Sequence, residues 1–403
     1  MVHPADAHAA YRGRMRVAIV SESFLPTVSG VTTSVCQVLR QLRRTGHEAM
    51  VIAPSGSPAR VVPTEFAGFP VHTVPAVSYR QFPVGLPNPR VLRLLEGFGP
   101  DVLHAASPFL LGAQGIASAR RLGVPSVAVF QTDVAGYAAR NHLGSASRLA
   151  WQFVRWVHEG ADLTLVPSSA SLADLRRVGV SRLDRWARGV DLAGYHPNNR
   201  LEPAARALRG RLAPNGEVVI GYVGRIAPEK QVERFRALRG LSGISIALVG
   251  DGPSTPLVER ALAGLPVTWL GRLAGAELAA AYASFDVFVH AGTEETFGQT
   301  LQEASAAGLP VVAPRAGGPI DLVEHGRNGF LFTPDDDRDL RRHVAALVAD
   351  APLRRRMGEA GRRMVLGRSW ENVCAELFDY YRLVIDEGLA TRAETLVPVA
   401  HRR

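Results

Sequence analysis

The chain has 403 residues, of which 47% are hydrophobic and 21% are charged, so it is long enough for two domains with well-filled cores. Its two cysteines lie far apart, which excludes a disulfide framework, and no apolar run is long enough to span a bilayer. The formal charge of +9 resides in residues 1–200, where 21 arginines face 12 acidic residues, and this favours an anionic partner such as an acidic lipid surface, an acidic sugar or a phosphorylated acceptor.

The basic first half has a second explanation, because an arginine-rich surface can simply keep a protein in solution. We predict no nucleic-acid partner, since no recognition motif or aromatic-rich binding strand accompanies the arginines. The start of the chain lacks an apolar signal core, and we predict a disordered leader over residues 1–14.

Short apolar runs alternate with helix-like segments through the first half of the chain. Each run ends in a polar or Gly/Pro loop, as expected of buried parallel strands in βαβ units. The predicted strands are Arg16–Val20, Ala49–Ala53, Val102–His104, Ser126–Phe130 and Leu163–Val166. Gly30 follows the first strand and precedes a helix, where a glycine lets the backbone approach a ligand. The GxGxxG dinucleotide fingerprint is missing from this turn, which argues against a nicotinamide dehydrogenase.

The segment Arg148–Gly160 interleaves aromatic and basic residues, with Trp151, Phe153 and Trp156 among them. Such a helix can lie on an anionic membrane, or it can pack on the sheet as an ordinary element of the fold. Combined with the basic first half, it leads us to predict peripheral membrane contact through the first domain.

The second half repeats the alternation, with predicted strands Val218–Val223, Ser245–Val249, Val267–Leu270, Val287–His290 and Val311–Ala313. Two doubly wound α/β halves, with a crevice between the carboxyl ends of their strands, form the simplest architecture. We predict an N-terminal domain at 15–197, a helix-containing linker at 198–216 and a C-terminal domain at 217–369. A helix at 370–390 is predicted to pack back on the N-terminal domain, followed by a tail at 391–403.

Lys230 is the only lysine among 46 basic residues, and it lies in GYVGRIAPEK (Gly221–Lys230). A compact ammonium group, where the rest of the chain uses planar guanidinium groups, indicates a phosphate oxygen in a confined place. Arg225 supplies a second cation just past a predicted strand. The alternative is a surface lysine that escaped the arginine bias.

The stretch Asp286–Gly318 predicts a strand, a loop, a helix and a second strand. Glu295 and Glu303 lie on either side of the loop-to-helix junction, and Gly298 falls near the helix start, where N–H groups and the helix dipole favour an anion. Carboxylates on both sides of a bound phosphate can accept hydrogen bonds from sugar hydroxyls, which suits a nucleotide-sugar. The alternative is an ordinary crossover with one capping and one solvated acid.

The acidic run Asp335–Asp337 is the one segment that invites a metal interpretation. It precedes a helix-like stretch, and we predict that it caps this helix rather than binding Mg²⁺.

Taken in order along nearly the whole chain, these motifs resemble the family-four retaining glycosyltransferases, whose GT-B architecture has two Rossmann-like domains facing across a cleft. The matching segments are the loop near Gly30, RGVD (Arg188–Asp191), GRIAPEK, LVGDGP (Leu248–Pro253), GRL (Gly271–Leu273) and ETFGQTLQE (Glu295–Glu303). Within the family, SESFLPTVSGVTTSV, FQTDVAGYA and RWARGVD are most similar to the actinobacterial GDP-mannose-dependent α-mannosyltransferases of glycolipid synthesis.

The resemblance implies a donor site that lies mainly in the C-terminal domain. Arg225 and Lys230 would hold the donor diphosphate, Glu303 would accept the ribose hydroxyls, and Glu295 would fix the hexose. Backbone groups would complete the site: Gly30 and the N–H groups of Thr300 and Leu301 near the phosphates, Leu273 at the base, and Phe297, Gly298 and Gln299 at the hexose.

The chain departs from the family pattern where the acceptor would bind. Many members have a His-x-His pair, but this chain has His104 followed by Ala106, so Asp133 becomes the best candidate for meeting the acceptor. The predicted catalytic residues are Glu295, Asp133 and His104, although a histidine at a strand end can equally be structural. Ser29 replaces the first of the usual paired glycines before the first helix.

The predicted function is transfer of an α-mannosyl unit from GDP-mannose to a lipid-linked, anionic glycolipid acceptor by a cytoplasmic enzyme on the inner face of the cell membrane. No metal or other cofactor is predicted, because two cations and a helix N-terminus can stabilise the leaving diphosphate. Front-face attack is favoured over double displacement. The alternatives are a UDP-sugar donor, a non-catalytic nucleotide-sugar-binding protein, and a Rossmann-type oxidoreductase or epimerase. The donor's identity is implied only by the resemblance.

Overall fold

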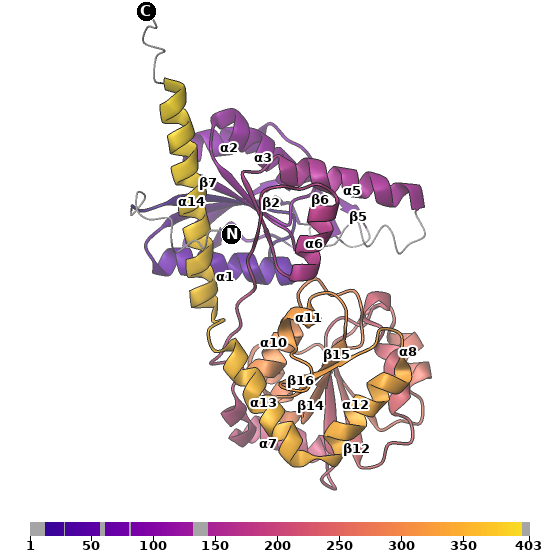
Figure 1. Cartoon of the computed structure of the whole chain (residues 1–403). Helices are drawn as coiled ribbons and strands as arrows, with labels where there is room; N and C mark the ends of the chain where they lie inside the picture. Colours follow the sequence, from indigo (N-terminus) through magenta and orange to yellow (C-terminus); the bar gives the residue numbers. More distant parts are fainter. Residues whose placement is uncertain (1–12, 28, 57–60, 80–81, 132–143, 397–403) are drawn as a thin grey trace, which may run out of the picture. The chain divides into compact units, whose positions relative to one another are not determined.

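The computed structural model describes residues 13–27, 29–56, 61–79, 82–131 and 144–396, and it divides the chain into two compact units (Figure 1). Unit 1 comprises residues 1–167, 171–187 and 373–403, and unit 2 comprises residues 168–170 and 188–372. Each unit is built on its own mainly parallel sheet with helices on both faces.

Within the described residues, the sheet of unit 1 has eight strands in the order β10-β9-β8-β7-β1-β2-β4-β3, and only the β3–β4 pair is antiparallel. The strands are β1 (Arg16–Ser21), β2 (Glu48–Pro54), β3 (Glu65–Phe66), β4 (Phe69–Val74), β7 (Val102–Ala106), β8 (Ser126–Val129), β9 (Leu163–Val166) and β10 (Leu183–Arg185). A separate hairpin consists of β5 (Ala76–Tyr79) and β6 (Phe82–Gly85).

Helices α2 (Arg90–Phe98), α3 (Leu110–Leu122) and α5 (Gly144–Glu159) cover one face of this sheet, while α1 (Gly30–Arg44) and α14 (Trp370–Leu396) lie on the other (Figure 1). Neighbouring residues of β7 show the alternation, because Leu103 joins the buried cluster under α2 and α3 whereas His104 contacts Tyr381 of α14. Helix α6 (Ser169–Arg177) follows β9 in the chain.

Two hydrogen bonds join helix α14 to the rest of unit 1. The indole Nε1 of Trp186 donates to the carbonyl of Val373 at 2.8 Å, and the Tyr380 hydroxyl donates to the carbonyl of Arg185 at 3.1 Å. Trp186 and Tyr381 are among the largest fully buried side chains described. The last helix of the chain is therefore part of the core that the first strands build.

The N-terminus of α3 is capped by a carboxylate from a distant segment. Oε1 of Glu22, just after β1, accepts hydrogen bonds from the backbone N–H groups of Phe109 and Gly112, each at 2.7 Å. Burial raises the pKa of Glu22, and these N–H groups oppose that rise. A negative charge at this end of a helix also interacts favourably with the helix dipole.

Replacing Glu22 by Ala is expected to lower the free energy of unfolding by about 2 kcal/mol, because two N–H groups lose their acceptor. The urea midpoint measures the loss, and hydrogen exchange should localise it to the first turn of α3. Glu65→Ala, at an exposed acid of the same unit, is the matched control. Equal midpoints for the two variants would show that Glu22 is not a stabilising cap.

The sheet of unit 2 is wholly parallel within the described residues, with six strands in the order β13-β12-β11-β14-β15-β16. The strands are β11 (Val218–Val223), β12 (Ile244–Val249), β13 (Val267–Gly271), β14 (Val287–Val289), β15 (Val311–Pro314) and β16 (Gly329–Phe332). The α-helices are α7 (Pro203–Leu212), α8 (Thr255–Ala261), α9 (Gly275–Ser284), α10 (Gln299–Ala306), α11 (Pro319–Leu322), α12 (Asp337–Ala349) and α13 (Ala351–Val365). The short 3₁₀ helices are η2 (Pro197–Leu201), η3 (Pro228–Lys230) and η4 (Val232–Leu238).

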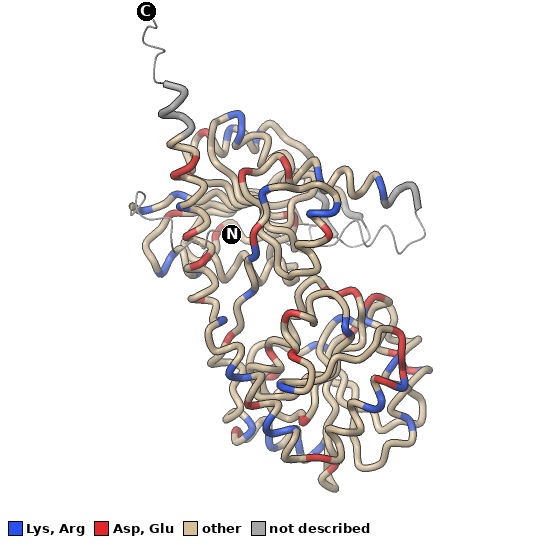
Figure 2. The backbone as a smooth tube through the Cα atoms, viewed as in Figure 1, with Lys and Arg blue, Asp and Glu red and all other residues tan. Residues whose placement is uncertain are grey.

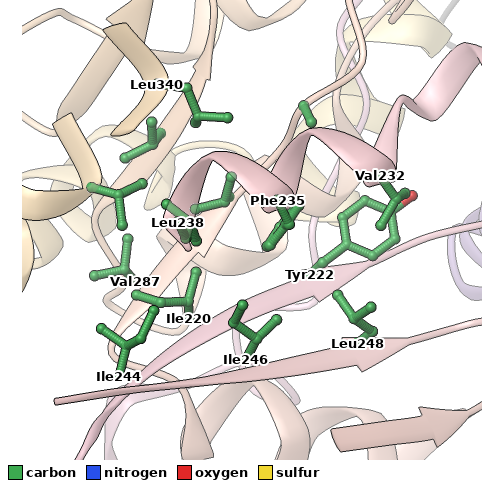
Figure 3. Packing of buried hydrophobic residues seen from close by; sticks show 14 of the residues in the cluster. Ile220, Tyr222, Val232, Phe235, Leu238, Ile244, Ile246, Leu248, Val287 and Leu340 are labelled. Atoms are coloured by element: carbon green, nitrogen blue, oxygen red, sulfur yellow. The ribbon is translucent and has the colours of Figure 1, made fainter. Parts of the chain in front are cut away.

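The core of unit 2 lies between β11, β12 and the helix η4, as Figure 3 shows. Tyr222 and Leu248 of the sheet, with their neighbours, pack against Val232, Phe235 and Leu238 of the helix, and all are fully buried. Full burial of each such apolar side chain is worth about 1.5–3 kcal/mol. Because η4 starts two residues after Lys230, this packing fixes the loop that carries the lysine.

Three features differ from or refine the sequence prediction. The segment 198–216, predicted as a linker, lies inside unit 2, where Arg209 of α7 pairs with Asp286 and donates to the carbonyl of Glu217 at 3.0 Å. Asp336 caps α12 by accepting from two backbone N–H groups, as predicted for the acidic run. No helix in the described part of the chain combines the length and apolar character needed to cross a bilayer.

Candidate functional site

The strand order of unit 2 reverses between β11 and β14, which are neighbours in the sheet but are separated in the chain by β12 and β13. At such a reversal the loops that leave the two strands diverge and make room for a ligand at their carboxyl ends. The loop after β11 leads to Lys230, and the loop after β14 contains Glu295. Two motifs found separately in the sequence therefore meet at one edge of the sheet.

Lys230 and Glu295 form a partly buried ion pair, with 2.7 Å between Nζ and Oε2. The other carboxylate oxygen of Glu295 accepts from the backbone N–H groups of Gly298 at 3.1 Å and Phe297 at 3.4 Å. Burial alone would raise the pKa of Glu295, but Lys230 and the backbone donors lower it to about 2. The carboxylate is therefore ionised and held in a fixed orientation.

Glycines let these loops pack backbone to backbone. A Cβ at Gly292 would lie 2.4 Å from the carbonyl oxygen of Glu229, and one at Gly318 would lie 2.3 Å from that of Phe297. Gly318 also donates its N–H to the carbonyl of Glu295 at 2.7 Å. Side chains at these two glycines would push apart the segments that carry Lys230 and Glu295.

Arg225 lies at the exposed mouth of the same loop, where its guanidinium pairs with Glu229 at 2.5 Å. The turn around Gly252 braces this loop, because Ile226 donates its N–H to the carbonyl of Asp251 at 2.8 Å. Leu273 follows β13 and is partly exposed beyond that turn. The predicted diphosphate cations and the predicted base contact are thus carried by loops after β11 and β13, which leave the same edge of the sheet.

Glu303 lies on α10 and accepts hydrogen bonds from the Tyr282 hydroxyl at 2.8 Å and from Nε2 of Gln299 at 3.4 Å. Burial raises the pKa of Glu303 to about 7, Asp191 acts in the same direction, and the two hydrogen bonds and Arg188 oppose it. Glu295 and Glu303 therefore differ in protonation at neutral pH. Glu295 is ionised, whereas Glu303 is close to the midpoint of its titration.

Arg188 interacts electrostatically with Glu295 and Glu303. The sequence alone had assigned no role to this residue. Gln302 and Gln299 of α10 hold its segment by donating to the carbonyls of Arg188 at 2.8 Å and Gly189 at 3.1 Å. Burial lowers the pKa of Arg188 to about 10, while Glu295 and Glu303 raise it, so the guanidinium stays charged. The RGVD motif marked this segment, but only the fold shows which charges it meets.

Two further groups at the site also escaped the sequence analysis. Tyr282 of α9 is fully buried and orients Glu303, and His290 follows β14 beside Lys230 and Glu295. Burial lowers the pKa of His290 to about 4, so its imidazole is neutral at physiological pH. No sequence motif distinguished either residue from an ordinary core position.

The N-terminus of α10 requires one correction. Gly298 caps it with a φ of 101°, in the left-handed region that glycine adopts without strain. The N–H of Leu301, predicted to meet a phosphate, already donates to the carbonyl of Gly298 at 3.0 Å. First-turn N–H groups that precede it, such as that of Thr300, are the better candidates.

Three site residues were predicted in the first domain, namely Gly30, His104 and Asp133, and the structure describes the first two. Gly30 is the first residue of α1, behind an N-cap at Ser29 whose hydroxyl accepts from the N–H of Thr32 at 3.1 Å. His104 is 1% exposed, with Nδ1 2.5 Å from the Tyr381 hydroxyl, and burial lowers its pKa to about 3. These features favour the structural alternative for His104, as a neutral side chain in the core of unit 1. Asp133 lies outside the described residues.

Two protein-family models match the chain in succession. Residues 28–193 match Glycosyltransferase Family 4, and residues 206–364 match Glycosyl transferases group 1. A "GDP-mannose-dependent alpha-mannosyltransferase" of Mycolicibacterium smegmatis is 49% identical over 92% of this chain and 98% of its own length. The protein of that name in Corynebacterium glutamicum is 42% identical over 92% and 89%. The "Sulfoquinovosyl transferase SQD2" of Arabidopsis thaliana is 35% identical over 91% and 72%.

Solved structures share the fold at much lower identity. A sucrose-phosphate synthase from Thermosynechococcus elongatus has a TM-score of 0.77 at 21% identity and covers 93% of this chain and all of its own. The Anabaena protein HepE, solved with UDP and glucose, has a TM-score of 0.73 at 19% identity and covers 92% of this chain and all of its own. The predicted fold class, two Rossmann-like doubly wound domains of the GT-B type, is confirmed.

Proposed function

The chain belongs to the family 4 glycosyltransferases, and from this we propose that it transfers an α-mannosyl unit from GDP-mannose to a lipid-linked acceptor. Mannosyl transfer follows the names of relatives that are 42–49% identical over nearly the whole chain. The observation that carries the proposal to specific residues is the Lys230–Glu295 pair, held where the strand order of unit 2 reverses.

Each part of the donor then meets a group of matching chemistry. Lys230 and Arg225 neutralise the diphosphate, the ionised carboxylate of Glu295 accepts hydrogen bonds from the hexose, and Glu303 accepts from the ribose. Backbone groups of Leu273, Phe297, Gly298, Gln299 and Thr300 line the base, the hexose and the phosphate. Glu295 is suited to its part because Lys230 and two backbone N–H groups keep its carboxylate charged and oriented.

The proposed reaction retains the anomeric configuration by front-face attack. The bond between C1 of mannose and the diphosphate oxygen breaks, the acceptor oxygen bonds to C1 from the same side, and its proton passes to the departing phosphate. The cations at the site stabilise the charge that develops on the diphosphate, which is the task that a metal ion performs in other phosphate-leaving reactions. We therefore propose metal-independent turnover, and full activity in excess EDTA is the expected result.

The acceptor and the location form a separate part of the proposal. Among the relatives, one of 29% identity over 80% of this chain is named "Alpha-monoglucosyldiacylglycerol synthase", in Acholeplasma laidlawii. A lipid-linked acceptor places the enzyme at a membrane, and the basic first half of the chain supports attachment to an anionic inner surface. We propose a cytoplasmic, peripheral enzyme on the inner face of the cell membrane.

A thermal-shift panel of GDP-mannose, GDP, UDP-glucose, UDP-N-acetylglucosamine and NAD tests the donor. A ligand that binds only the native protein stabilises it by about 2.7 kcal/mol when present at a hundredfold excess over its Kd. We expect the melting temperature to rise with GDP-mannose and GDP, and this rise to disappear in Lys230→Ala. A response confined to the uridine nucleotides would overturn the mannose donor, and a response confined to NAD would overturn transfer itself.

A non-catalytic donor-binding protein is the alternative from another functional class. Glu295→Gln separates the two cases, because a mere binder should lose little affinity while a transferase should lose most of its rate. Release of GDP from GDP-mannose, in the presence of membrane lipid extract, is the assay. No release by the wild-type protein would leave the binding role as the better description.

A further inference from the structure

Unit 1 contains a pocket of about 460 Å³ that takes no part in the proposed donor site. It lies between α3 and α5, and its lining follows one stripe on each helix, at a spacing of three or four residues. Small residues create the space, since Ala113 and Ala117 of α3 face Gly160 at the end of α5. Several of its lining side chains are exposed, so the pocket is open to solvent and accessible to a ligand.

Two arginines from different helices line this pocket, Arg120 of α3 and Arg155 of α5. Among the residues that the structure describes, neither has an ion pair within 4.0 Å, although charged partners are common on the rest of the surface. The Arg155 guanidinium lies close to Gly179, where an added Cβ would be 3.2 Å from its Cζ. Guanidinium groups without an ion-pair partner are suited to bind phosphate oxygens.

One acid, Glu159, also lines the pocket, and its carboxylate interacts with Ser181, Arg182 and Arg155. Oε1 accepts from the N–H of Ser181 at 2.7 Å and from its hydroxyl at 3.0 Å, and these bonds lower the pKa of Glu159. Arg182 lies beside the same residue and donates to its carbonyl at 2.9 Å. Helix α3 has no acid, and Glu159 is the only one on α5, so the surroundings remain positive. Figure 2 marks these charges along the backbone.

Exposed apolar side chains adjoin the arginines. Trp156 lines the pocket and is 64% exposed, and Leu149 lies two turns earlier on α5 and is 66% exposed. Most tryptophans are largely buried, whereas those at membrane surfaces are placed with the ring among lipid headgroups. A basic pocket beside an exposed Trp and Leu matches the two parts of an acidic lipid, its anionic headgroup and its apolar chains.

We propose that the α3–α5 pocket binds the phosphate of an acidic phospholipid headgroup, while Trp156 and Leu149 enter the boundary between headgroups and acyl chains. The proposal rests on the proposed function only in that a lipid-linked acceptor brings the enzyme to a membrane. It assigns membrane attachment to one site with defined contacts, in place of diffuse attraction between a basic surface and an anionic one. The donor site in unit 2 is not part of it.

Vesicle co-sedimentation tests the site with the full-length protein, comparing pure phosphatidylcholine with an equal mixture of phosphatidylcholine and phosphatidylglycerol. The test variant is Arg120→Gln/Arg155→Gln. The matched control is Arg121→Gln/Arg148→Gln, which removes the same charge from exposed positions of the same helices outside the pocket. We expect both to bind the acidic vesicles more weakly, and the pocket variant to lose at least about tenfold more. Equal losses would overturn the proposal in favour of diffuse attraction, as would no preference of the wild type for acidic vesicles.

A soluble phosphate distinguishes a lipid site from a small-molecule site. Glycerol 3-phosphate at matched ionic strength should compete weakly with acidic vesicles for the wild-type protein. Strong stabilisation by glycerol 3-phosphate without vesicle binding would overturn the lipid assignment. Fluorescence gives an independent readout, since Trp156→Phe should abolish most of the blue shift on vesicle binding. The response of both double variants to GDP-mannose should equal that of the wild type, so a failed donor test and a failed lipid test remain distinguishable.

Discussion

Replacing Lys230 by Ala is expected to lower kcat/KM for GDP-mannose by about 100- to 1,000-fold, the loss typical of removing one preorganised group that stabilises developing charge. The lysine ammonium lies 2.7 Å from Glu295 and 21% of its side chain is exposed, so it faces both the carboxylate and the space in which a diphosphate would lie. Steady-state release of GDP measures the effect, and circular dichroism verifies that the variant is folded.

Two companion variants test the physical reason. Lys230→Arg should recover little activity, because a planar fork does not fit where a compact ammonium makes a single 2.7 Å contact. Lys230→Ala/Glu295→Gln should lose less than the sum of the single losses, because each single change leaves a charge without its partner. Arg236→Ala, at an exposed arginine paired with Asp337, is the control and should keep full activity. A Lys230→Ala enzyme within about threefold of wild type would contradict the oxyanion-type role.

Glu303→Gln is expected to make the protein more stable and less active at pH 8. Its carboxylate titrates near pH 7 because burial penalises the charged form, so above that pH the folded state holds an unfavourable charge. Removing the charge should raise the melting temperature. Activity should fall about tenfold to a hundredfold in kcat/KM, because hydrogen bonds from the ribose to a charged acceptor are worth about 1.5–3 kcal/mol.

The gain in stability of Glu303→Gln should depend on pH. The pKa of Glu303 is higher in the folded than in the unfolded protein, so the folded state binds the proton more tightly and stability falls as pH rises from about 4.5 to about 7. The stability gain of Glu303→Gln should therefore be full above pH 7 and vanish towards pH 4. Wild-type KM for the donor should rise below pH 7, and Tyr282→Phe should move that rise to higher pH by removing a hydrogen bond that favours the charged form. A KM that is independent of pH between 5 and 8 would contradict the assignment.

The architecture could be predicted from sequence because central parallel strands are nearly continuous apolar runs. Val218–Val223 was predicted with the bounds that the structure gives to β11, and each of the ten predicted strands overlaps an observed one. Two of the missed strands, at the two edges of the first sheet, have weak signals. The edge strand β10 (Leu183–Arg185) has the sequence LDR and is only partly buried, and β3 (Glu65–Phe66) has two residues.

The candidate site could be predicted only where chemistry and spacing coincide in one segment. Lys230 stood out by residue type and Glu295 by its distance from Glu303, but the contact between them depends on the pairing of β11 with β14. Arg188 and Tyr282 reach the acids from segments far apart in the chain, and no local pattern reports that. The burial of His104 could not be predicted locally, because Tyr381, which it contacts, lies at the other end of the chain.

The route of the chain through its two units has a consequence for the order of folding during synthesis. Unit 2 is complete once residue 372 has been made, whereas unit 1 still lacks the helix that supplies Tyr381 to His104 and the Val373 carbonyl to Trp186. The unit that begins first on the ribosome is therefore the last to be finished. Until α14 emerges, the face of the first sheet that it covers stays open, and a nascent chain stalled before Val373 carries one finished unit and one that still needs protection from aggregation.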